Sequence, residues 1–494
     1  MRGIPTRFLV IASAAGLLFA AGASAVLAER GKIPVTTASE EARGEFLRGR
    51  DLAERLQITD SYSHFQKAVA LDPGFAWAEL SLATSAPTGQ EFFDHLDKAV
   101  RLADKASDGE RFLILATQAG ANNDTVKQKG LLEQLVAAYP GDERAHFNLG
   151  GYYFGQQEYD SAIEHYRKAT EINPGYSTAY NILGYAYRQS GDYANAEKAF
   201  QKYIELIPKD PNPYDSYAEL LLKMGRFDES IAQYRKALEI DPHFVNAHQG
   251  IAMDLLYSGK ADLAEKELAE LTRKARTDGE RRTALFARTI VHLDEGRTGK
   301  ALADVDEQLA LGRKGNDVPA MAFDCRLKGL ILVENGKADL ARKEFDDGLR
   351  IVEESSLSAE VKDNGRLVHH YNLARVALAR RDIAGARKEA DAFRQGAMSA
   401  KNPLTAKNAH ELDGLIALAE KDYDKAIAEL QQANPQNPED RYRLCQAYGA
   451  KGDAARAAET CRQAADFNSL PNLNYALVRT KAKASAFALK KAGL

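Results

Sequence analysis

The sequence predicts an all-α fold, an α-solenoid in which about eleven helical hairpins stack side by side and a C-terminal helix caps the stack. Three observations lead to this fold: a 34-residue internal repeat, two helix-period apolar patterns in each repeat, and a polar turn between those patterns. With 494 residues, of which 45% are hydrophobic, the chain is too apolar to be disordered throughout.

The repeat is clearest where two segments align without a gap. Residues 144–174 read RAHFNLGGYYFGQQEYDSAIEHYRKATEINP, and residues 178–208 read TAYNILGYAYRQSGDYANAEKAFQKYIELIP. A turn such as Gly191-Asp192 separates two amphipathic patterns, and a proline such as Pro208 ends the second one because it cannot continue a helix. Each unit is therefore expected to form a helical hairpin. Units are expected to start at Ala42, Gly109, Glu143, Ser177, Pro211 and Val245.

In its period and in the residue types at fixed places, the chain resembles the tetratricopeptide repeat family. Small residues such as Gly150 and Ala162 let the two helices of a unit approach, and aromatic residues fill the gap to the next unit. The resemblance implies a superhelix whose inner wall is built from the first helix of each unit. The matching residues in two successive units are Leu149, Gly150, Tyr153, Ala162, Tyr166, Ala169 and Pro174, then Leu183, Gly184, Tyr187, Ala196, Phe200, Tyr203 and Pro208.

Beyond about residue 278 the pattern loosens, and longer hairpins are expected. We predict a linker over residues 26–41, a regular array over 42–278 and a divergent array over 279–468, with a bend near residues 272–282. Turns of the divergent array are expected at Gly296-Arg297, Gly336-Lys337, Arg381-Asp382, Lys421-Asp422 and Gly452-Asp453.

Residues 469–494 form a basic segment that is expected to be the capping helix. It carries no acid, and its polar face would solvate the end of the stack, as repeat arrays require. The alternative is weak binding of this helix to an anionic membrane surface. Its basic residues are Arg479, Lys481, Lys483, Lys490 and Lys491.

The N-terminus has the composition of an export signal. Arg2 and Arg7 precede an uncharged apolar run over residues 8–28, and small residues at Ala23 and Ala25 fit a cleavage site. We expect residues 1–25 to be a signal peptide, and the alternative is an uncleaved anchor that reaches residue 28. The protein is thus expected to be exported, periplasmic or secreted, and membrane-anchored if the signal stays.

Charge and motifs argue against nucleic-acid binding and against catalysis. Sixty-six basic and 70 acidic residues give a formal charge of −4, which provides no general attraction for a polyphosphate. No motif typical of metal, nucleotide or nucleophilic chemistry is present, so no cofactor, metal site or enzymatic activity is expected. His146, His248, His370 and His410 share one position, the fourth residue of a first helix, which favours packing over metal binding.

Cys445 and Cys461 lie on the two facing helices of one predicted hairpin, 16 residues apart. In an oxidising compartment they would form a disulfide, and the alternative is two small buried thiols. Cys325 belongs to another unit and has no predicted partner.

The resemblance also places a partner-binding groove on the inner wall. This wall is polar, rich in amides and mixed in charge, which suits an extended peptide better than an apolar helix. The predicted groove residues are Arg144, Phe147, Asn181, Tyr185, Arg188, Asp215, Glu219, Asn246 and Gln249.

These observations favour an exported, non-catalytic scaffold that holds a protein or peptide partner in its groove, as an assembly or docking factor of the envelope. Two alternatives stay open. A glycan-binding or carbohydrate-enzyme accessory protein would expose Tyr152, Tyr176 and Tyr185 as one strip. A self-assembling scaffold would form homo-oligomers.

Overall fold

The computed structural model describes residues 31–55, 57–399, 402 and 404–491. The predicted signal segment lies outside these residues. Within them the chain forms 25 α-helices and one short 3₁₀ helix. The helices are α2 (Glu40–Glu54), α3 (Ile58–Leu71), α4 (Ala76–Thr84), α5 (Gly89–Leu102), η1 (Ala103–Lys105), α6 (Asp108–Ala121), α7 (Thr125–Ala138), α8 (Glu143–Gly155), α9 (Tyr159–Ile172), α10 (Ser177–Ser190), α11 (Tyr193–Leu206), α12 (Asn212–Lys223), α13 (Phe227–Ile240), α14 (Val245–Tyr257), α15 (Ala261–Lys274), α16 (Asp278–Asp294), α17 (Thr298–Lys314), α18 (Val318–Glu334), α19 (Ala338–Glu353), α20 (Ala359–Ala379), α21 (Ile383–Ser399), α22 (Leu404–Glu420), α23 (Tyr423–Leu430), α24 (Pro438–Lys451), α25 (Ala454–Ala465) and α26 (Leu473–Lys491).

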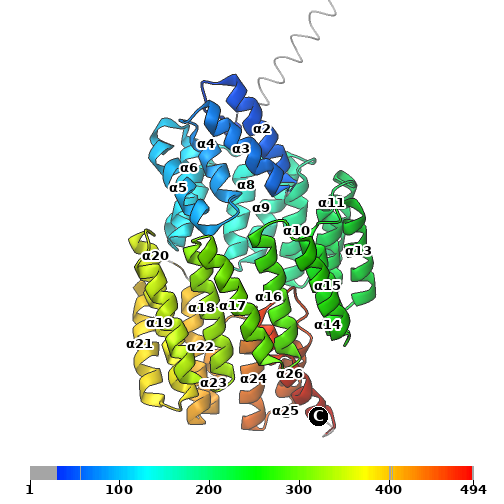
Figure 1. The fold of residues 1–494 in the computed structure, drawn as a ribbon, viewed down its shortest axis with the longest axis vertical. Coiled ribbons are helices and arrows are strands. Elements are labelled where there is room, and N and C mark those ends of the chain that lie inside the picture. The colour runs from blue at the N-terminus through cyan, green and yellow to red at the C-terminus, as the bar shows by residue number, and fades with distance from the viewer. Residues whose placement is uncertain (1–30, 56, 400–401, 403, 492–494) are drawn as a thin grey trace, which may run out of the picture.

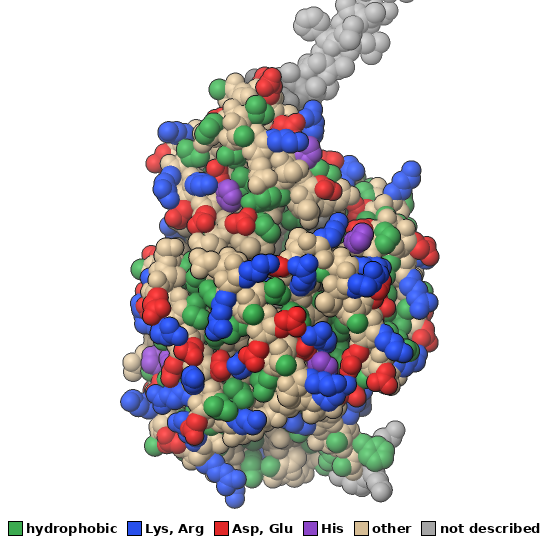
Figure 2. Space-filling view, viewed as in Figure 1, with side chains coloured by type: hydrophobic (Ala, Val, Ile, Leu, Met, Phe, Trp, Pro, Cys, Tyr) green, Lys and Arg blue, Asp and Glu red, His purple; other side chains and the backbone are tan. Residues whose placement is uncertain are grey.

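The predicted all-α solenoid is confirmed. Helices α2 to α25 form twelve antiparallel hairpins, each of which packs on the next, and α26 follows the last one (Figure 1). The even-numbered helix comes first in every hairpin, and successive first helices such as α12 and α14 also touch one another. First helices therefore line the inner face of the curved stack. Charged side chains of both signs are interspersed over the face shown in Figure 2.

One hairpin more is present than the eleven expected from the sequence. The additional pair is α4 and α5, which lies between the units predicted at Ala42 and Gly109. Helix α4 is nine residues long, and the connection to α5 contains Pro87 in place of the usual glycine-polar turn. The periodic signal was lost there because this hairpin lacks the turn residues that mark the others.

The turns of the divergent array lie where the sequence places them. At Gly296, Gly336 and Gly452 the backbone φ is positive, between 69° and 89°, a conformation that glycine adopts without steric cost. Arg381 and Lys421 hold the same turn with φ of 59° and 65°. The left-handed residue ends the first helix and reverses the chain, so that the second helix packs back on the first.

Glycines on the first helices make room for large side chains of the second helices. A Cβ atom built on Gly184 would lie 2.7 Å from the ring of Phe200, and one built on Gly329 would lie 2.3 Å from the ring of Phe345. The two residues of each pair are 16 positions apart, as are Gly150 and Tyr166. The helices of a hairpin approach closely only because no side chain stands at the glycine.

The four histidines link the two helices of their hairpins, but only His146 and His248 are buried and are the fourth residue of a first helix. Helices α20 and α22 begin earlier than expected, and the side chains of His370 and His410 are 43% and 35% exposed. The Nδ1 atoms of His370 and His410 lie 2.7 Å from Glu389 and Glu429, each 19 residues further along the chain. His248 bonds in the same way to Glu267. In the hairpin of α8 and α9 a second histidine, His165, stands in place of the acid, and the Nδ1 atoms of His146 and His165 lie 3.1 Å apart. Burial lowers the pKa of both imidazoles. No group of three or more potential metal ligands occurs among the described residues.

The stack continues without interruption across the predicted bend. Helices α15 and α16 pack together, and one hydrophobic cluster extends from Leu268 and Leu271 on α15 to Ala284 and Ala287 on α16. The described part of the predicted linker also lies on the array, because the Ile33 amide donates to Asp142 over 2.8 Å.

The C-terminal helix α26 packs on α25, the last helix of the stack, and also reaches the first helices α16 and α18 (Figure 1). Tyr475, Val478 and Ala482 are buried in the same hydrophobic cluster as Leu268. The expectation of a fully solvated polar face does not hold at Arg479, which is 6% exposed and paired with Asp294 on α16. In the described part of the chain no helix combines the length and hydrophobicity needed to cross a bilayer.

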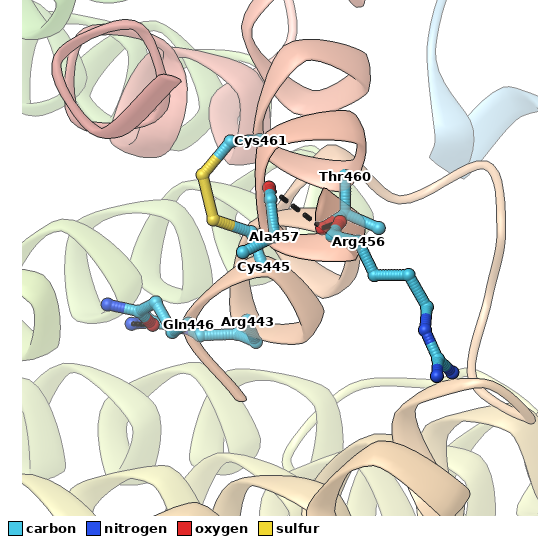
Figure 3. The surroundings of a disulfide bond; sticks show 7 residues. All are labelled: Arg443, Cys445, Gln446, Arg456, Ala457, Thr460 and Cys461. Atoms are coloured by element: carbon cyan, nitrogen blue, oxygen red, sulfur yellow. Dashed lines mark hydrogen bonds between the residues drawn. A yellow bond between two sulfur atoms is a disulfide. The ribbon is translucent and has the colours of Figure 1, made fainter. Parts of the chain in front are cut away.

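A disulfide joins Cys445 on α24 to Cys461 on α25, with their Cα atoms 5.2 Å apart (Figure 3). Arg443 and Gln446 extend from α24 on the opposite side from Arg456 of α25, as Figure 3 shows. Cys325 is a buried free thiol.

Replacing Gly184 by alanine is expected to destabilise the protein by about 1–3 kcal/mol, because the new methyl group overlaps the Phe200 ring. A Cβ atom built on Gly130 in α7 would meet no other part of the protein within 4 Å, so Gly130→Ala is expected to be neutral or to stabilise by up to about 1 kcal/mol through helix propensity. Urea unfolding of both variants measures the difference. Equal stability of the two variants would contradict the proposed helix approach.

Candidate functional site

One side chain from every hairpin from α10/α11 to α24/α25 contributes to a continuous row on the inner face. Each lies two residues before the left-handed turn residue that ends the first helix. We call this set the inner row. Its members are Gln189, Lys223, Tyr257, Asp294, Glu334, Ala379, Ala419 and Ala450.

The first part of the inner row holds a non-helical stretch of the chain itself. Lys223 on α12 donates from Nζ to the main-chain carbonyl of Phe467 over 2.5 Å, and Tyr257 on α14 donates from its hydroxyl to the carbonyl of Ser469 over 2.8 Å. The two carbonyls belong to alternate residues of the connection between α25 and α26. Side chains of successive hairpins thus bind this stretch through hydrogen bonds to its main chain.

The next two members of the inner row are acids that pair with bases of α26. Arg479 donates from Nε and Nη2 to Asp294, over 2.7 and 2.5 Å. Lys481 lies 3.2 Å from Glu334. Asp294 is 6% exposed, so its carboxylate has exchanged water for the guanidinium.

Burial, and then the charges of Arg188 and Arg441, lower the pKa of Lys223 to about 7.

Beyond Glu334 the inner row consists of alanines, and these alanines line an open pocket of about 510 Å³. First helices α18, α20, α22 and α24 contribute its walls. Ala379, Ala419 and Ala450 are exposed, and the leucines beside them are half-buried. We call this cavity the inner pocket. Its apolar wall includes Val333, Leu378, Leu415 and Leu418.

Charged residues form the floor of the inner pocket. Arg375 lies 2.7 Å from Glu439, and Arg443 lies 3.1 Å from the same carboxylate and 2.9 Å from Glu334. Glu411 accepts a hydrogen bond from the Tyr371 hydroxyl over 2.6 Å and lies 3.6 Å from Arg375. Four first helices are therefore connected by one ionic network.

The network fixes the ionisation of its members. Burial alone would raise the pKa of Glu439, but Arg375 and Arg443 outweigh burial and lower this pKa to about 2. Burial raises the pKa of Glu411 in spite of Arg375. Asp440, beside Glu439, has a pKa well above its usual range because it is buried and faces Glu411 and Glu439.

Several predicted groove residues bind other parts of the chain. Arg144 pairs with Glu54, at the end of α2, over 2.7 Å and lies over the ring of Tyr176. Phe147 packs against Tyr166 and Tyr176. The first hairpin therefore contacts the inner face of α8.

Further along the inner face, other predicted groove residues bond to each other. Glu219 accepts a hydrogen bond from the Tyr185 hydroxyl over 2.9 Å and pairs with Arg188 over 3.1 Å. Asn181 and Gln249 are buried and donate to Asn212 and to the Thr283 carbonyl, respectively. The remaining two differ from each other in exposure, since Asp215 is fully buried and Asn246 is exposed.

Burial raises the pKa of Asp215 well above its usual range, and the neighbouring Glu219 adds to this shift. The strip of exposed tyrosines required by the glycan alternative does not form. Tyr152 and Tyr176 are 7% and 6% exposed, and Tyr185 packs edge-on against Phe200.

The comparisons with known proteins agree with the repeat geometry. The tetratricopeptide repeat family is matched at residues 142–209 and 175–243 by one family model, and at 221–288 and 417–479 by another. Residues 142–288 and 417–479 are therefore tetratricopeptide repeats. No curated protein matches the chain significantly.

The solved structures that resemble this chain match parts of it. The crystal structure of MamA protein is 23% identical and covers 34% of this chain and 91% of its own, with a TM-score of 0.29. A tetratricopeptide repeat protein from Parabacteroides merdae ATCC 43184 is 15% identical and covers 58% and 99%, with a TM-score of 0.34. MamA 41-end from Desulfovibrio magneticus RS-1 is 14% identical and covers 35% and 99%, with a TM-score of 0.30.

Removing Glu439 is expected to destabilise the protein by about 3–5 kcal/mol, because Glu439→Ala leaves two buried guanidinium groups with one partner fewer. Chemical unfolding measures the loss. In the wild type the stabilisation by Glu439 is present above pH 4.5, its ordinary pKa, and is lost as the pH falls toward about 2.

The matched control is Glu459→Ala on α25, which removes an exposed carboxylate that pairs with Arg462 three residues away. This change is expected to alter stability by less than about 1 kcal/mol. An equal loss of unfolding free energy in both variants would show that the buried ion pairs of Glu439 stabilise the protein no more than an exposed pair does.

Proposed function

We propose that this protein is a non-catalytic scaffold that holds a segment of a partner protein on its inner face. The proposal rests on one observation: Lys223 and Tyr257 donate hydrogen bonds to the main-chain carbonyls of Phe467 and Ser469, two alternate residues of a non-helical stretch. Because every peptide has carbonyls at this spacing, the same geometry suits any extended segment. The inner row thus has the chemistry of a peptide-binding wall.

The inner face also has room for a partner. Residues 467–481 contact the part of the inner row from Lys223 to Glu334, and the inner pocket, which Glu334 also lines, continues the row from there. Its walls are first helices held by buried ion pairs, so little ordering is required when a ligand binds. A preformed cavity on a rigid face is typical of a binding site.

Photo-crosslinking from single positions of the full chain tests this function. A crosslinking residue at Asn246 or Ala419, both exposed on first helices, is expected to capture one and the same partner protein in native envelope extracts. The matched outer positions are Val126 and Leu340, exposed by 63% and 55% on second helices, and these are expected to capture none. Capture of that partner from the outer positions would overturn the proposal.

We further propose that the chain is exported, as the composition of residues 1–28 suggests. The disulfide between Cys445 and Cys461 supports export, because disulfides persist in oxidising compartments. Envelope docking or assembly is then the setting in which the partner is met.

The intact mass and thiol content of the natively expressed chain check the export proposal. We expect a chain that begins at Val26, or at Glu29 if the small residues Val26 and Ala28 form the cleavage site instead, with one reactive thiol after denaturation, Cys325. A cytoplasmic chain that keeps Met1 and has three free thiols would refute it.

A further inference from the structure

We infer that the inner pocket binds a neutral, extended peptide segment through a large aliphatic side chain. This inference rests on the proposed scaffold function and names the chemistry of the segment that is held. The three observations behind it are the small residues of the inner row, the balanced charge of the floor, and the peptide already held by the neighbouring hairpins.

The size of the side chains along the inner row changes at Glu334. The four members from Lys223 to Glu334 each bond to or pair with one of residues 467–481. Ala379, Ala419 and Ala450 follow, and their methyl groups leave about 510 Å³ open between α18, α20, α22 and α24. A ligand that continues along the row therefore meets space for a bulky group.

The wall that faces this space is aliphatic. Leu378, Leu415 and Leu418 line it and are half-buried, so part of their surface is left for a ligand to cover. Burying one leucine-sized side chain contributes about 1.5–3 kcal/mol, which favours an aliphatic residue in this place.

The charges at the floor balance. The charged residues that line the pocket are Arg375 and Arg443, which pair with Glu334 and Glu439, so two cationic side chains face two acidic ones. Each carboxylate already lies within 4 Å of a cation, so a charged ligand would have to break existing pairs. The pocket therefore selects against both acidic and basic side chains.

A polar side chain at the rim suits a peptide group. Gln446 on α24 lines the pocket and is exposed. Its side-chain amide carries one donor group and one acceptor, which match the C=O and N–H of a main-chain amide, and neither partner is charged.

The ligand is a peptide and not a free lipid or other hydrocarbon because of the neighbouring hairpins. Lys223 and Tyr257 hold main-chain carbonyls in the same row, and the disulfide joins the α24 wall to α25. The pocket is thus a continuation of a wall that already holds extended chain.

The test uses the full chain with labelled leucine methyl groups and three blocked peptides that differ in charge. Acetyl-Ala-Leu-Ala-Leu-Ala-amide is expected to shift the methyl resonances of Leu378, Leu415 and Leu418 in a saturable manner. The matched peptides with aspartate or with lysine in place of leucine are expected to bind at least about tenfold more weakly, because they bring an unpaired charge to the pocket.

Filling the pocket supplies the control. Ala419→Trp is expected to abolish binding of the leucine peptide, whereas Ala428→Trp, at an exposed alanine of the second helix α23, is expected to leave it unchanged. If Ala419→Trp unfolds in a thermal melt, Ala379→Trp replaces it. Equal or tighter binding of a charged peptide, or undiminished binding to both folded variants, would overturn the inference.

This outcome is separate from failure of the proposed function. Capture of a partner from Asn246 without any leucine-peptide shift at Leu415 would leave the scaffold function intact and reject the pocket assignment. If the leucine peptide shifts the methyl resonances in a saturable manner but no partner is captured preferentially from the inner positions, the pocket assignment would stand and the scaffold function would be rejected.

Discussion

The close approach of two helices at a missing side chain is the constraint on which the rest of the structure depends. Phe200 and Phe345 occupy the space over Gly184 and Gly329, and this contact sets the spacing of the two helices in their hairpins. Because each hairpin packs on the next in the same manner, residues at the same position of successive units are brought into line. The inner row is a result of that alignment and not of any local sequence motif.

On this regular framework, differences between units generate the functional surface. The inner row passes from donors at Lys223 and Tyr257 to acids at Asp294 and Glu334 and then to alanines. Each member stands two residues before a left-handed turn residue, so the side chain at this place decides what a ligand contacts. Buried ion pairs between α18, α20 and α24 hold the alanine region in place without filling it.

The sequence was sufficient to predict the hairpins because periodicity and turn residues are local signals. It predicted the five turns of the divergent array, and it missed the pair α4 and α5, whose connection has no glycine-polar turn. The interior course of α26 could not be predicted, since the pairing of Arg479 with Asp294 joins residues 185 positions apart. For the same reason Arg144, Asn181 and Asp215 were predicted to face a groove, while the structure packs them against other parts of the chain.

Repeat arrays usually behave as one-dimensional systems, in which each unit interacts only with its neighbours and stability is a sum along the chain. The contacts of α26 change this expectation. By joining α25 to α14, α16 and α18, the last helix links units that are far apart in the array. Fraying from the C-terminal end would break contacts in the middle of the stack as well, so α12 to α26 should unfold as one cooperative unit instead of repeat by repeat.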